Sequence, residues 1–133
     1  AAILRVKLQN LKDELIERQI MALKYRVALN PVNLIPGVLP KNITHGNHLF
    51  VIRSENRDRL KEKLEGEGIM PLVHYPQPIH FQPAFQRIGN VTYTTRHFPV
   101  SENASRQILS LPFYPGLPVE SQDKILETVN SWI

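Results

Sequence analysis

The first 29 residues of the chain carry apolar side chains at helical spacing and contain neither glycine nor proline. Good helix formers such as Leu, Ala, Lys and Glu fill this run, so it predicts one helix about 43 Å long at roughly 1.5 Å per residue. Its apolar positions form two stripes that differ by about 120° around the helix axis. The first stripe comprises Leu4, Leu8, Leu11 and Leu15, and the second comprises Ile16, Ile20, Leu23 and Val27.

Two stripes on one helix predict two packing partners. A coiled coil would keep a single seam, but Arg18 and Gln19 occupy the next positions expected of the first stripe. We therefore expect the second half of the helix to pack on this chain and the first half to pack on another body. The helix also opens at Ala1 without a capping residue, which predicts a fragment of a longer protein. We divide the chain into a connector helix, 1–29, that continues from a missing domain, and a small domain, 30–133.

The remaining pattern predicts short strands that alternate with helices. Apolar runs predict strands at 47–53, 69–74 and 108–112, with a further extended piece at 32–36. The run at 47–53 is long enough to be central in a sheet and buried on both faces. Proline and glycine boundaries predict helices at 54–68, 83–89, 99–107 and from 118 onward, and polar stretches predict loops at 37–46 and 90–97. This order predicts an α/β or α+β fold, with a small open sheet of three to four strands packed with helices.

Composition and charge exclude several classes of function. The chain has no cysteine, which excludes disulfides, thiol nucleophiles and zinc sites of the cysteine type, and which is compatible with a reducing cytoplasm. No apolar run approaches the roughly 20 residues that a membrane span needs. The net charge is +4, but basic residues are interleaved with acidic ones as on solvated helix faces. We therefore expect neither a nucleic-acid partner nor a membrane.

The richest chemistry lies in residues 69–82, which hold two histidines, a tyrosine and three prolines. Proline fixes φ and lacks an N–H group, so a strand that enters this stretch ends at Pro76 and no helix begins before Pro78. Such a rigid turn would hold His74, Tyr75 and His80 in front of a ligand. The alternative is a proline-rich connection whose rings pack against the domain. The spacing of the two histidines matches no metal motif.

Several motifs follow one another in order after the opening helix. They are NHLFVI at 47–52, NRDRL at 56–60, HYPQPIH at 74–80, QPAF at 82–85, FPVSE at 98–102 and LSLPFYP at 109–115. Together they resemble the C-terminal part of the DegT/StrS family of sugar aminotransferases. The resemblance implies a fold type I enzyme with pyridoxal phosphate as its cofactor. It also implies a cytoplasmic homodimer that transfers an amino group from glutamate to a keto group of a nucleotide-linked sugar.

The resemblance also implies a role for each candidate residue. His74 and Tyr75 match the motif that reaches the sugar or its pyrophosphate, and His80 serves either the substrate or the proline corner. Within the family, the corner leans toward 3-keto substrates, and the sequence leaves the choice between 3-keto and 4-keto open. The lysine that carries the cofactor would lie in the missing large domain, because the lysines of this chain fall on solvated helix faces or in a loop. These are Lys7, Lys12, Lys24, Lys41, Lys61, Lys63 and Lys124. We therefore expect this chain alone to hold no catalytic or cofactor-binding residue and no transaminase activity.

A second hypothesis keeps the fold but removes the chemistry. In it, the chain is a non-enzymatic module that binds a partner through the leucine stripe of the first helix. Addition of the missing domain distinguishes the two hypotheses. It restores a yellow, dimeric, cofactor-bound protein under the first and changes nothing under the second.

Overall fold

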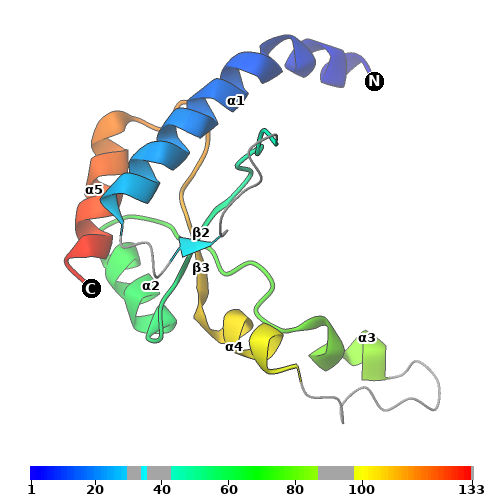
Figure 1. Cartoon of the computed structure of the whole chain (residues 1–133), viewed down its shortest axis with the longest axis vertical. Helices are drawn as coiled ribbons and strands as arrows, with labels where there is room; N and C mark the ends of the chain where they lie inside the picture. The colour runs from blue at the N-terminus through cyan, green and yellow to red at the C-terminus, as the bar shows by residue number, and fades with distance from the viewer. Residues whose placement is uncertain (30–33, 36–42, 87–97, 133) are drawn as a thin grey trace.

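A three-stranded antiparallel sheet lies at the centre of the structure, with helices packed around it (Figure 1). The computed structural model describes residues 1–29, 34–35, 43–86 and 98–132. Within this part, the elements are α1 (Ala2–Ala28), β1 (Leu34–Ile35), β2 (Phe50–Arg53), α2 (Arg57–Gly66), η2 (Ile79–Phe81), α3 (Pro83–Gln86), α4 (Pro99–Gln107), β3 (Ile108–Leu111) and α5 (Val119–Asn130). The α+β fold predicted from the sequence is confirmed.

The middle strand of the sheet is β2, as its apolar run predicted. It pairs with β1 on one side and with β3 on the other, where Phe50 lies opposite Leu111 and Arg53 lies opposite Ile108. The strand begins at Phe50, three residues later than predicted. Asn47 is excluded from the strand because its φ of 42° is a left-handed conformation that a pleated strand does not adopt.

The strand predicted at 69–74 is wrong. Only Leu72 pairs with the sheet, through two hydrogen bonds with Ser110 whose N···O distances are 2.9 and 2.8 Å. Pro71 has no N–H group to donate, and Tyr75 turns left-handed at a φ of 60°, so the pairing cannot extend in either direction. The described sheet therefore has three strands, the lower end of the predicted three to four.

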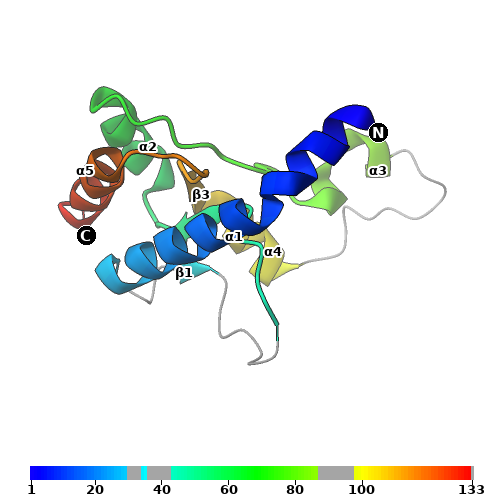
Figure 2. The same cartoon turned by 90° about the horizontal axis from the view of Figure 1, so that it is seen from above.

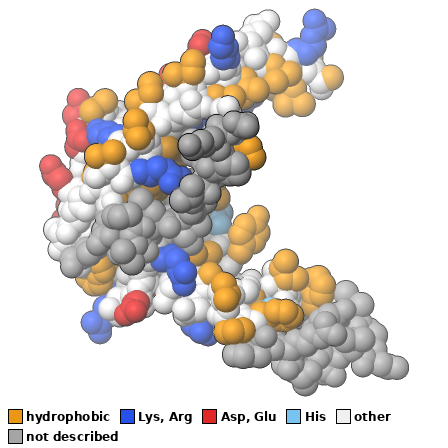
Figure 3. All heavy atoms as spheres, in the orientation of Figure 1, with side chains coloured by type: hydrophobic (Ala, Val, Ile, Leu, Met, Phe, Trp, Pro, Cys, Tyr) orange, Lys and Arg blue, Asp and Glu red, His pale blue; other side chains and the backbone are white. Residues whose placement is uncertain are grey.

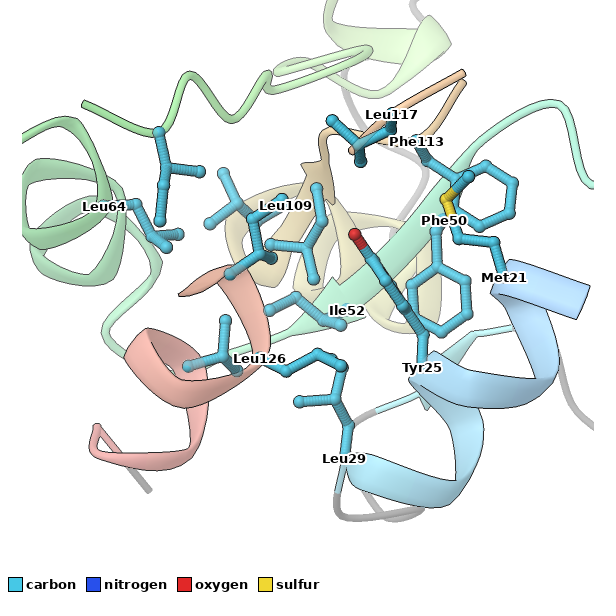
Figure 4. Close-up of a cluster of buried hydrophobic side chains, with 14 of the residues drawn as sticks. Met21, Tyr25, Leu29, Phe50, Ile52, Leu64, Leu109, Phe113, Leu117 and Leu126 are labelled. Carbon is cyan, nitrogen blue, oxygen red and sulfur yellow. The ribbon is translucent and has the colours of Figure 1, made fainter. Parts of the chain in front are cut away.

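One face of the sheet builds the hydrophobic core. Phe50 and Ile52 are buried, whereas Val51 and Arg53 on the opposite face are half-buried, which corrects the expectation of burial on both faces. Figure 4 shows the core between this face and the helices α1, α2 and α5. Side chains from these elements include Met21, Tyr25, Leu29, Leu60, Leu64, Leu109, Ile125, Leu126 and Val129. Each large apolar side chain contributes about 1.5–3 kcal/mol when it is fully buried.

The long helix α1 packs on the core through a different face from the one predicted. The second stripe, Ile16, Ile20, Leu23 and Val27, is exposed. The buried side chains are instead Met21, Ala22, Tyr25 and Leu29. Positions 18, 22, 25 and 29 continue the three-and-four spacing of the leucine stripe, so one seam runs along the whole helix.

Arg18 does not interrupt this seam, because its guanidinium donates hydrogen bonds to backbone carbonyl oxygens. It donates hydrogen bonds to the carbonyl oxygens of Asn47, His48 and Phe113, at 3.1, 3.2 and 3.5 Å. The half of α1 before Arg18 is different. It extends past the sheet in both views (Figures 1 and 2), and Leu4, Leu8 and Leu11 are exposed along it.

Proline and glycine set the helix boundaries largely as predicted. Pro99 opens α4, Pro118 precedes α5, and Gly68, at a φ of 75°, reverses the chain after α2. The predictions for residues 32–33, 36–42 and 87–97 lie outside the described part of the chain. Within that part, no helix has both the length and the hydropathy that a membrane crossing requires.

Candidate functional site

The proline corner, residues 74–78, is anchored to the sheet through residues 71–73 and projects away from it. Pro71 is fully buried, Leu72 pairs with Ser110 of β3, and Val73 packs against the core. From there the chain runs to η2 along a side where the molecular outline is concave, between α1 and the segment that carries η2, α3 and α4 (Figures 1 and 3). The corner is thus a projection from a rigid base.

His74 is held in place by the same residue that pairs with Leu72. Its Nδ1 lies 2.8 Å from the hydroxyl Oγ of Ser110. Ser110 is buried and points to the side of β3 opposite to Leu109 and Leu111, because strand side chains alternate. Nε2 of the partly buried His74 makes no hydrogen bond within the described residues. One ring nitrogen is therefore fixed and the other remains available to a ligand.

Tyr75 projects from the corner into solvent. It has a φ of 60°, in the left-handed region that non-glycine residues seldom occupy, and 78% of its surface is exposed. Its ring borders an open hollow of about 390 Å³. The other residues that line this hollow are Pro76, Gln77, Gln82, Pro83 and Ala84. The hollow is thus lined by one tyrosine and two glutamines.

His80 does not join His74 and Tyr75, although the sequence suggested all three. Only 8% of its surface is exposed. Its Nε2 lies 3.2 Å from a carboxylate oxygen of Glu102, and its ring packs against Phe81 and Phe98 at centroid distances of 4.3 and 4.9 Å. Glu102 also accepts a hydrogen bond of 2.8 Å from the backbone N–H of Phe98, at the start of α4. His80 and Glu102 thus join η2 to α4.

Two residues of the site, Ser110 and Glu102, were missed by sequence reasoning. Ser110 lies 36 positions from His74, and Glu102 lies 22 positions from His80. One signal was present: Ser110 is a polar residue inside an apolar strand, where a buried hydroxyl needs a partner. The sequence did not indicate which partner it takes. No group of three metal-ligating side chains gathers among the residues the structure describes.

Comparison with known proteins places this chain and its fold within one family. The model of the DegT/DnrJ/EryC1/StrS aminotransferase family matches residues 1–130, and the chain belongs to this family. Enzymes of this family depend on pyridoxal phosphate.

The chain is similar to particular members of the family. It is 38% identical to the erythromycin biosynthesis sensory transduction protein EryC1 of Saccharopolyspora erythraea, over 98% of this chain and 35% of that protein. It is 33% identical to the dTDP-3-amino-3,4,6-trideoxy-alpha-D-glucose transaminase of Streptomyces venezuelae, over 99% of this chain and 34% of that protein. The crystal structure of S. venezuelae DesV in complex with a ketimine intermediate superposes with a TM-score of 0.86 at 32% identity, over 98% of this chain and 35% of that one. The chain thus spans about a third of the length of these relatives.

The described lysines do not fit the cofactor. Pyridoxal phosphate needs a partly desolvated lysine, and none of the described lysines is buried. Lys24 forms an ion pair with Asp123 at 2.6 Å, Lys124 pairs with Glu67 at 3.5 Å, and Lys63 donates to Ser131 at 2.8 Å. The others are Lys7 and Lys12, which are exposed, and Lys61, which pairs with Glu65. Lys41 lies outside the described residues.

Proposed function

We propose that this chain is the C-terminal small domain of an aminotransferase that uses pyridoxal phosphate. The enzyme is a cytoplasmic homodimer that moves an amino group from glutamate to a keto group of a nucleotide-linked sugar. Residues 1–29 form the connector helix from a large domain, and residues 30–133 form the small domain. Membership of the family supports the class of reaction. The name of one relative, a transaminase that makes a 3-amino sugar, supports transfer at C3.

The observation that carries the proposal for the site is the conformation of Tyr75. A left-handed backbone at a large side chain costs about 1 kcal/mol or more, and an exposed ring recovers none of it by packing. The protein holds Tyr75 in this state beside a histidine that is fixed through one nitrogen. Strain of this kind persists where it positions a group for binding. We therefore assign His74 and Tyr75 as contacts to the nucleotide-linked sugar.

The two side chains suit this substrate chemically. A neutral imidazole and a phenol each donate a hydrogen bond, and sugar hydroxyls and phosphate oxygens accept them. The hollow beside Tyr75 adds the amides of Gln77 and Gln82, which both donate and accept. The corner thus offers several neutral hydrogen-bonding groups to a polyhydroxylated ligand.

His80 takes a different role in this proposal. Its burial and its contact with Glu102 keep it from a ligand in solvent. We assign it as a positioning residue that ties η2, which follows the corner directly, to the first turn of α4. The sequence had left the choice between substrate contact and structural partner open, and the burial of His80 favours the second.

No step of the reaction is assigned to a lysine of this chain. The amine that carries the cofactor is supplied by the rest of the enzyme, and the chain on its own is inactive. The exposed leucines of α1 then form the surface that meets the large domain. This accounts for the leucine stripe without the alternative of a non-enzymatic module, which family membership also disfavours.

Substitution of the two substrate contacts in the full-length enzyme tests the assignment. His74→Phe and Tyr75→Phe each remove one hydrogen-bonding group while they keep a ring. We expect KM for the nucleotide-linked keto sugar to rise about tenfold, or roughly 1.4 kcal/mol. Amino-group uptake from glutamate, measured without sugar, stays unchanged.

The matched control is His48→Phe, because His48 is an exposed histidine whose side chain makes no hydrogen bond within the described residues. We expect it to leave both steps unchanged. Equal effects of His74→Phe and His48→Phe on KM would contradict the assignment of His74.

A further inference from the structure

The hydroxyl of Ser110 faces a single hydrogen-bond partner. Ser110 is 5% exposed, and within the described residues its Oγ contacts only Nδ1 of His74, at 2.8 Å. A hydroxyl has one proton to donate, and a buried donor without an acceptor is destabilising. A lone pair of the same oxygen that lacks a donor costs less free energy than an O–H group that lacks an acceptor. This difference favours an arrangement in which the O–H group of Ser110 points at Nδ1 of His74.

This direction fixes the protonation pattern of the imidazole. In a neutral histidine, one ring nitrogen carries the proton and the other accepts. With Nδ1 as the acceptor of the Ser110 hydrogen bond, the proton lies on Nε2. Nε2 has no partner within the described residues, so His74 offers an N–H donor to a ligand.

The backbone makes this arrangement rigid. Ser110 N–H donates to the carbonyl oxygen of Leu72 at 2.8 Å, and Leu72 N–H donates to the carbonyl oxygen of Ser110 at 2.9 Å. Leu72 lies two residues before His74, so three hydrogen bonds join residues 72–74 to one residue of β3, Ser110. The side chain and the backbone of Ser110 thus define both the place and the orientation of the His74 ring.

We infer that Ser110 is a positioning residue for substrate binding: its hydroxyl holds His74 as the Nε2–H tautomer, so that the imidazole donates to an oxygen of the nucleotide-linked sugar. This inference rests on the proposed function, which makes His74 a substrate contact. The acceptor is an oxygen of the sugar or of the pyrophosphate.

The first test reads the tautomer directly in the full-length enzyme. Magic-angle-spinning NMR of protein with ¹⁵N-labelled histidine reports the protonation of both ring nitrogens, and the His74 signals are assigned by their loss in His74→Phe. We expect Nε2 protonated and Nδ1 unprotonated. In Ser110→Ala, the Nδ1 resonance shifts because it loses the donated hydrogen bond. A protonated Nδ1, or His74 resonances that stay in place in Ser110→Ala, overturns the inference.

The second test measures the effect of Ser110 substitutions on substrate binding. Ser110→Ala is expected to raise KM for the nucleotide-linked keto sugar about two- to tenfold, the range for one neutral hydrogen bond, with kcat unchanged. Ser110→Cys keeps the volume but donates weakly, so it should resemble Ser110→Ala. Ser110→Thr keeps the hydroxyl and should restore KM to within about twofold. Loss of binding in Ser110→Thr as large as in Ser110→Ala, with both proteins folded, would contradict a role for the hydroxyl.

The two claims fail in different ways. If the NMR shows the Nε2–H tautomer but His74→Phe leaves KM unchanged, the substrate role of His74 fails, and with it the role of Ser110 in binding. If His74→Phe raises KM but the tautomer is Nδ1–H, the inference about Ser110 fails and the proposed function stands.

Inhibition constants for dTDP and UDP identify the acceptor. Ser110→Ala weakens these inhibitors if the acceptor is the pyrophosphate and spares them if it is the sugar.

Discussion

Tyr75 combines two properties that do not stabilise a fold. Its backbone occupies the left-handed region, and its ring lies largely in solvent. The structure holds both in place because Leu72 and His74 are hydrogen-bonded to Ser110 on one side and Pro78 is buried on the other. Glycine would adopt the same backbone at no steric cost. Under the proposal, a tyrosine is retained in this position because its ring contacts the substrate.

Substitution of Tyr75 by glycine separates stability from binding. Tyr75→Gly relieves the left-handed strain, and we expect the free energy of unfolding to rise by up to about 1 kcal/mol after the entropy cost of glycine. KM for the nucleotide-linked sugar should rise about tenfold in the same variant. Tyr75→Phe keeps the strain, so its denaturation midpoint should match that of the unsubstituted protein. A clear loss of stability in Tyr75→Gly would show that the ring supports the fold.

Tyr25 gives the fold a dependence on alkaline pH. Burial raises the pKa of its phenol above the usual range, and the nearby carboxylate of Asp123 adds to the effect. An unfolded tyrosine ionises near pH 10, so above that pH the unfolded state has lost a proton that the folded state keeps. The contribution is fully present below about pH 10, and stability falls by about 1.4 kcal/mol per pH unit above it.

Denaturant unfolding of the chain at pH 8 and pH 11 checks this. Tyr25→Phe lacks the hydrogen bond of 3.3 Å to the carbonyl oxygen of Pro112, so at pH 8 its free energy of unfolding should be about 0.5–1.5 kcal/mol lower than that of the unsubstituted chain. Between pH 8 and pH 11, its free energy of unfolding should fall by about 1.4 kcal/mol less than that of the unsubstituted chain. The control is Tyr75→Phe at an exposed position, which should leave the pH dependence of the free energy of unfolding unchanged. The same pH dependence in Tyr25→Phe and in the unsubstituted chain would contradict the role of Tyr25.

At the scale of single residues, the sequence predicted which stretch is special but not how its members divide. His74, Tyr75 and His80 were selected because prolines surround them. The structure then places Tyr75 in solvent and His80 in a buried pair with Glu102. Burial and pairing depend on segments far apart in the chain, and no local pattern encodes them. The local pattern could therefore locate the corner but not assign its roles.

Helix α1 shows how one charged residue misleads a pattern at the scale of an element. The spacing of Leu4, Leu8, Leu11 and Leu15 continues through Arg18 and on to Tyr25, but a charge at a seam position indicated a break. The break is absent because the long arginine side chain donates to backbone carbonyls at the edge of the core. The sequence predicted the extent of the helix correctly and its buried face incorrectly.

The leucine half of α1 should drive self-association of the 133-residue chain. Leu4 and Leu8 are 63% and 61% exposed, and burial of each against a partner contributes about 1.5–3 kcal/mol. We expect size-exclusion chromatography with light scattering to show oligomers that dissociate when both leucines are replaced by glutamine. Glutamine keeps the helix propensity nearly unchanged.

A second pair on the same helix provides the control. Ile20 and Leu23 are 65% and 64% exposed and belong to the second stripe, on a different face of the helix. Their replacement by glutamine should leave the oligomers intact. A purely monomeric chain, or equal effects of the two pairs, would contradict the role of the leucine stripe.

Elements with proline or glycine boundaries were predicted well. α4, β3 and α5 begin and end close to the expected residues because proline and glycine constrain the backbone locally. The strand predicted at 69–74 failed, because a strand requires a partner with free donors and acceptors over several residues. Only Leu72 has that opportunity between Pro71 and the turn at Tyr75. Local constraints therefore fix boundaries, and tertiary pairing decides whether an apolar run becomes a strand.

At the scale of the whole molecule, the proposal divides the work of an enzyme between two bodies. In this proposal, the corner contributes hydrogen-bonding groups for the substrate, while the described lysines of the chain are solvated or paired. The body that packs on the leucine half of α1 would supply the lysine for the cofactor. The concave side of the molecule, which the corner borders, then faces that body (Figure 3).

Chemical trapping of the cofactor tests this division most directly. The full-length protein is loaded with pyridoxal phosphate and reduced with borohydride, which fixes the cofactor covalently to the lysine that carries it, and mass spectrometry of the peptides locates that lysine. The 133-residue chain is treated in parallel. The account predicts one labelled lysine outside residues 1–133 and no specific label on the chain alone. Stoichiometric label on any of Lys7, Lys12, Lys24, Lys41, Lys61, Lys63 or Lys124 would contradict it.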